Sequence, residues 1–98
     1  MDETTATNIC GELRRGIQQY TKNLDPLMCN TGNPLSIEIF CYILQEKQTW
    51  LIGCKKIAAV FEEIDNEAIQ HQVKAIKLDL AAASRAESKF HQKYILAL

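Results

Sequence analysis

The side chains that could coordinate a metal ion or transfer a proton are few and widely spaced in this sequence. Its two histidines, His71 and His91, are separated by twenty positions. On one helix they would therefore lie ~30 Å apart and on roughly opposite faces, too far apart to share a metal ion. The carboxylates between residues 62 and 67 are nearly contiguous, which is typical of a solvated turn. We therefore predict no metal ion and no cofactor.

Phosphate-binding and catalytic patterns are also missing. The four glycines are isolated, so no glycine-rich loop is present to hold a nucleotide. Basic residues do come in pairs that could contact a phosphate backbone: Arg14 with Arg15, Lys55 with Lys56, and Lys74 with Lys77. Acidic residues are interspersed with them, and the net charge is only -1, so no global field attracts nucleic acid. We expect a protein that is not an enzyme, with nucleic-acid association through the basic pairs as the alternative function.

Four cysteines raise the alternative of a disulfide framework, for which three connectivities exist. No CxxC pair occurs among Cys10, Cys29, Cys41 and Cys54. Cys41 and Cys54 fall on one predicted helix, about 20 Å apart along its axis, which is too far for a disulfide. Reduced cysteines and the acidic, polar start MDETTATN favour an intracellular, cytoplasmic location over a secreted one.

Helical periodicity dominates the rest of the chain. Apolar residues recur at intervals of three and four in three segments, and no strand-like alternation competes with them. We expect a first helix over about 7–24, which Pro26 should end, and a loop over 25–33. A second helix should begin near Asn33-Pro34 and cover about 34–64, and a third should cover about 66–96.

A break at Asp65-Asn66, where either residue could cap the third helix, separates the two long helices. The alternative is one continuous rod of ~95 Å, which could not bury its own apolar stripe. We therefore predict a single all-α domain over 1–98: an antiparallel hairpin of two long helices with a shorter N-terminal helix, forming a three-helix bundle or a coiled-coil-like structure. Its core should contain eight residues of the hairpin: Leu44, Leu51, Ala58, Phe61, Val73, Ile76, Leu80 and Ala83.

The last apolar residues of the chain require a covering surface. A short first helix would leave one end of the hairpin exposed, and that end would include Phe90, Tyr94, Ile95 and Leu98. We expect these residues to bind a partner, with a second row, Ile43, Trp50 and Ile57, as the next candidate. The alternative is that Leu27, Met28 and the loop fold back over them.

These features together predict a non-catalytic protein–protein interaction subunit. It would be an adaptor, a scaffold or a chaperone-like component that contributes helices to a larger helical assembly, with a protein partner or a second copy bound through helix faces. No apolar run approaches the ~20 residues that a membrane span requires.

Overall fold

The computed structural model describes residues 2–29 and 34–92, and within them all side chains except those of 25–29, 34–41 and 43. The chain forms three helices, α1 (Glu3–Cys29), α2 (Pro34–Glu62) and α3 (Glu67–Phe90). No strand occurs in the described ranges. The all-α prediction is therefore confirmed.

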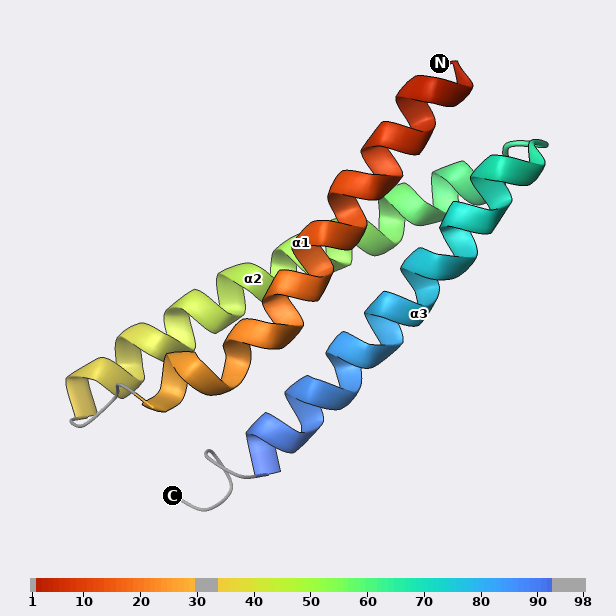
Figure 1. The fold of residues 1–98 in the computed structure, drawn as a ribbon. Coiled ribbons are helices and arrows are strands. Elements are labelled where there is room, and N and C mark those ends of the chain that lie inside the picture. The colour runs from red at the N-terminus through yellow and green to blue at the C-terminus, as the bar shows by residue number, and fades with distance from the viewer. Residues whose placement is uncertain (1, 30–33, 93–98) are drawn as a thin grey trace.

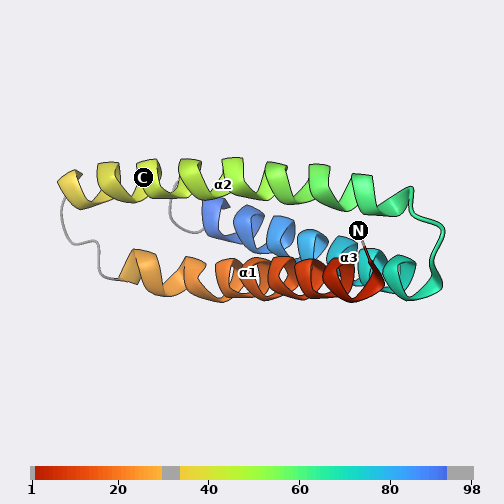
Figure 2. The same ribbon diagram turned by 90° about the horizontal axis from the view of Figure 1, so that it is seen from above.

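The helices form an elongated bundle with an up-down-up arrangement (Figures 1 and 2). α2 runs antiparallel to α3, as expected for the predicted hairpin, and α1 runs parallel to α3. The bundle measures 49 × 19 × 17 Å. The most extensive helix–helix packing is between α1 and α3, although these two helices are furthest apart in sequence.

Two side chains at the start of α3 stabilise the turn between α2 and α3 by hydrogen bonds to the backbone. Asn66 is the N-cap of α3, and its Oδ1 accepts a hydrogen bond of 3.0 Å from the Ile69 backbone N–H. The Gln70 side-chain amide donates to the carbonyl oxygens of Ile64 at 2.6 Å and Glu62 at 2.9 Å. These bonds satisfy backbone groups that both helix ends would leave unpaired. The predicted break at Asp65-Asn66 is confirmed.

Both predicted ends of the first helix are wrong. α1 begins at Glu3 because Asp2 caps it: the Thr5 backbone N–H donates to Asp2 Oδ1 at 2.7 Å, and this bond lowers the pKa of Asp2. α1 also continues through Pro26 to Cys29, so residues 25–29 are helix and not loop. Proline removes the single N–H that would bond the carbonyl of Lys22, and one lost bond does not prevent the remaining turn from forming.

The prediction of a shorter N-terminal helix is wrong for the same reason. α1 has 27 residues, whereas α3 has 24. The far end of the hairpin is therefore not left without a neighbour. The other bounds differ less: α2 ends at Glu62 and α3 starts at Glu67, whereas the predicted end of the third helix at 96 lies outside the described residues.

All three helices contribute to one core. Of the eight predicted core residues, Leu51, Ala58, Phe61, Val73, Ile76 and Ala83 are buried, and Leu44 and Leu80 are partly buried against them. α1 adds five residues to this core: Ala6, Cys10, Ile17, Tyr20 and Leu24. The alternation of three and four thus identified the buried faces correctly.

Two of the four cysteines belong to the core. Cys10 and Cys54 are buried free thiols, and burial raises the pKa of each. Cys41 and Cys54 both lie on α2, as predicted. The side chains of Cys29 and Cys41 lie outside the described residues, so the prediction of four reduced thiols is tested only for Cys10 and Cys54.

Candidate protein-interaction surface

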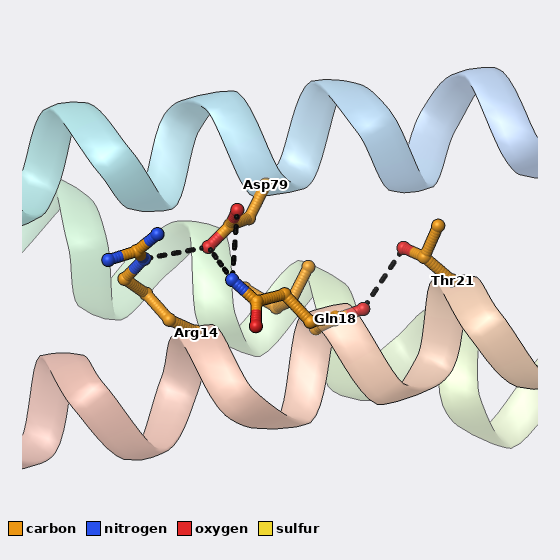
Figure 3. A network of polar contacts seen from close by, with 5 residues as sticks. Arg14, Gln18, Thr21 and Asp79 are labelled. Carbon is orange, nitrogen blue, oxygen red and sulfur yellow. Dashed lines mark hydrogen bonds and ion pairs between the residues drawn. The ribbon is translucent and has the colours of Figure 1, made fainter.

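Polar side chains connect α1 with α3. Asp79 of α3 points toward α1, where Arg14 and Gln18 reach it (Figure 3). Arg14 Nε donates to Asp79 Oδ2 at 2.9 Å, and the Gln18 amide lies 3.4 Å from both carboxylate oxygens. The Asp79 side chain is only 15% exposed, so this ion pair is better shielded from water than a typical surface pair.

A second contact joins the same two helices about two turns further along. The Tyr20 hydroxyl donates to Glu87 Oε1 at 2.5 Å. Burial, together with the hydrogen bond and the negative charge of Glu87, raises the pKa of Tyr20 well above its usual value. Because Arg14 pairs with Asp79 and Tyr20 with Glu87, α1 and α3 keep one parallel register over this stretch.

These contacts occupy several of the groups that could otherwise bind a polyanion. Arg14 pairs with Asp79, Arg15 pairs with Glu12 at 2.7 Å, and Lys77 pairs with Glu62. Half of the six residues in the basic pairs are therefore engaged with carboxylates of the same chain.

The two histidines lie at opposite ends of α3. His71 and His91 are exposed, the first near the start of α3 and the second at its C-cap. Within the described part of the chain, no three His, Cys, Asp or Glu side chains come close enough together to hold a metal ion.

The predicted C-terminal surface needs a correction at Phe90. Its side chain is only 3% exposed and belongs to the core, so it is not free to bind a partner. α1 runs parallel to α3, and the contact of Tyr20 with Glu87 places the second half of α1 beside the C-terminal turns of α3 and not at the middle of the hairpin. Tyr94, Ile95 and Leu98 lie outside the described residues, and the prediction for them stays untested.

The second predicted row leads to an exposed apolar surface on α2. Trp50, Gly53, Ile57 and Val60 each precede a buried residue of α2 by one position. The same three-four spacing thus occurs twice on this helix, turned by about 100°. With Tyr42 on the same side, these five residues form what we call the outer row.

The outer row is accessible over most of its length. Tyr42 is 65% exposed, Trp50 43%, Ile57 41% and Val60 67%. The side chain of Ile43 lies outside the described ones, and Ile64, which the heptad spacing places in this row, is only partly exposed and packs against the core. Tyr42 and Val60 were missed, although Val60 follows Ile57 at the helical spacing of three.

Trp50 is the point where the outer row meets α1. A Cβ atom on Gly16 would lie 2.7 Å from Trp50 Cη2 and 2.9 Å from Cζ2, closer than real Cβ contacts. Only glycine at position 16 therefore lets the indole lie against α1. The ring forms one wall of a groove of about 380 Å³ that is lined by Gly16, Gln19, Tyr20, Asn23, Glu46, Lys47 and Trp50.

Comparison with known proteins does not assign this chain to a family. No family model, no curated protein and no solved structure matches the chain. None of the described helices is both long and apolar enough to cross a bilayer. The fold and the surface define a small three-helix bundle whose middle helix has one buried and one exposed apolar row.

Proposed function

We propose that this protein is a non-catalytic protein–protein interaction subunit that associates through the outer row of α2. The observation that carries the proposal is the duplication of the apolar pattern on this helix. One row is enough to pack α2 into the bundle, and the second row leaves two aromatic and two aliphatic side chains in water.

The chemistry of the outer row suits a protein partner. Tyr and Trp are enriched at the energetic centres of interfaces, because they bury a large apolar area at a low cost in side-chain entropy. The Trp50 ring also lies against α1 at Gly16, so one side of it is already packed before a partner binds. Isolated exposed apolar residues are common on protein surfaces, but Trp50, Gly53, Ile57 and Val60 follow one another at helical spacing and form a contiguous patch.

An adaptor, scaffold or chaperone-like role within a larger helical assembly is the form of this function that we favour. A helix with an apolar row docks most readily against another helix. The buried thiols of Cys10 and Cys54 support an intracellular, cytoplasmic setting.

Two matched variants test the proposal. Val60→Glu places a charge in the outer row, and Leu78→Glu places one on α3 at a position of nearly the same exposure, 67% and 70% respectively. We expect Val60→Glu to abolish association, measured as self-association by light scattering or as co-purification of a reproducible partner from the native cell. Leu78→Glu should leave it intact.

Equal association of both variants would contradict the proposal. A nucleic-acid binder would behave differently, because its affinity would fall steeply as the salt concentration rises. Association through the outer row should change little between low and high salt.

A further inference from the structure

We propose that the outer row binds a second copy of this chain, with the two α2 helices antiparallel and a two-fold axis passing near Gly53. This inference rests on the proposed function and names its partner. Gly53 is the third of the five residues of the row. Trp50 and Lys56 lie three residues to either side of it, and Glu46 and Val60 lie seven residues to either side.

Nothing in the described part of the chain accounts for Gly53. A Cβ atom at this position would meet no atom within 4 Å, whereas a Cβ at Gly16 would strike Trp50. Glycine in a helix interior is less favourable than alanine, so a glycine with open space above it costs stability without relieving a contact. At the crossing point of two helices, it would allow a close approach of the backbones.

The charges beside the row favour an antiparallel pair. In that orientation Lys56 of the second copy faces Trp50, where its ammonium group can lie over the indole ring. Glu46 lies one helical turn from Trp50 and within reach of the same lysine. Parallel helices would instead place Glu46 against Glu46 and Lys56 against Lys56, and such like-charge contacts are strongly unfavourable.

The exposed area is consistent with a reversible dimer. Aromatic side chains carry ~150–250 Å² each, so the exposed fractions of Tyr42 and Trp50 amount to on the order of 200 Å². With Ile57 and Val60 counted on both copies, the apolar area comes to on the order of 800 Å², and flanking polar residues have to supply the rest of the ~1,200 Å² at which specific interfaces begin.

The first experiment uses a residue on the proposed axis. Gly53→Lys would place two positive charges against each other in the dimer. Gly11→Lys is the matched control, because Gly11 also lies mid-helix, partly exposed and with open space above it, but outside the outer row. In sedimentation equilibrium we expect Gly53→Lys to weaken self-association on the order of a hundredfold and Gly11→Lys to leave it unchanged.

The second experiment tests pairing and orientation. Glu46→Lys alone and Lys56→Glu alone each bring like charges together, and each should weaken the homodimer about tenfold. An equimolar mixture of these two variants should form a heterodimer more readily than either variant pairs with itself. Under mild oxidation Gly53→Cys should give a disulfide-linked dimer and Val60→Cys should not, because only a residue on the axis faces its own copy.

The outcomes separate this inference from the proposed function. A chain that is monomeric at all accessible concentrations, or a dimer that tolerates Gly53→Lys, would overturn the antiparallel pair. Efficient crosslinking of Val60→Cys would overturn the orientation. The proposed function would still stand in those cases if Val60→Glu, but not Leu78→Glu, abolished binding to a different partner.

Discussion

Replacing Gly16 with alanine tests the packing of Trp50 against α1. The indole reaches the backbone of α1 only because position 16 has no side chain, and the new Cβ would lie 2.7 Å from Cη2, about 0.7 Å inside ordinary van der Waals contact at 3.4 Å. Since the Cβ is fixed to a helix that the core and two polar contacts hold in place, the ring must move and not the helix.

Two opposing terms determine the size of the effect. Alanine in a helix interior is more favourable than glycine by about 1 kcal/mol. Forcing an extra methyl group into a packed contact typically costs about 1–3 kcal/mol. The net free energy of unfolding of Gly16→Ala should therefore lie between the wild-type value and about 2 kcal/mol below it.

Gly11→Ala is the control, because it adds the same methyl group to the same helix in open space. This variant should gain about 1 kcal/mol, so the two variants should differ by about 1–3 kcal/mol. Thermal unfolding followed by circular dichroism should show a melting temperature at least ~4 °C lower for Gly16→Ala than for Gly11→Ala.

Fluorescence reports the ring directly, since Trp50 is the single tryptophan of the chain. Displacement from α1 should shift its emission to the red in Gly16→Ala, and the emission of Gly11→Ala should match the wild type. If Gly16→Ala is instead as stable as Gly11→Ala and its emission is unchanged, the close contact between Gly16 and Trp50 does not exist.

Three further predictions concern the cap, the buried tyrosine and the thiols. Asn66→Ala should lower the free energy of unfolding by about 1 kcal/mol in urea titrations, and Asn66→Asp, which keeps an acceptor oxygen, should retain most of it. The folded protein holds the Tyr20 proton more tightly than the unfolded chain does, so the protonated hydroxyl stabilises the fold below pH ~10 and this stabilisation is lost as the pH rises further. The free energy of unfolding of Tyr20→Phe should therefore fall less steeply above pH ~10 than that of the wild type, and equal slopes would contradict the raised pKa of Tyr20. Cys10 and Cys54 should react with thiol reagents only as the protein unfolds, measured by mass spectrometry, and rapid labelling of the native protein would show that they are not buried.

The hairpin and its core were predictable because their signals are local. The side chain of Asn66 caps the helix that follows it, and the buried residues of α2 and α3 repeat at the helical period. Neither feature depends on how the first helix is placed. The helix start at Glu3 could also have been recognised, since Asp2 is a favoured capping residue three positions before Thr5.

The errors came from treating one local preference as decisive. Pro26 disfavours a helix, but its cost is limited to one hydrogen bond and a steric adjustment, and α1 continues to Cys29. The assumed short helix then left Phe90 exposed in the prediction, whereas the structure buries it. A parallel neighbour of full length could not be inferred from periodicity, since the pattern of each helix is the same whichever partner covers it.

The candidate surface was predictable in part. The sequence shows that α2 is apolar over a wide stripe, and Trp50 and Ile57 were identified from their spacing of seven. The row that faces the core was predicted correctly through Leu51, Ala58 and Phe61, but how much of the other row stays exposed depends on where α1 and α3 lie. Val60 was therefore missed, although it is among the most exposed apolar residues described.

The parallel pairing of α1 with α3 also has a consequence for the order of folding. The partners in these contacts are 65 to 67 residues apart in sequence, as in Arg14 with Asp79 and Tyr20 with Glu87. During synthesis at ~5–20 residues per second, the apolar face of α1 has to wait for several seconds before its main neighbour exists. The α2–α3 hairpin, whose contacts are closer in sequence, should form rapidly once both helices are available, and docking of α1 should complete the core and limit the folding rate.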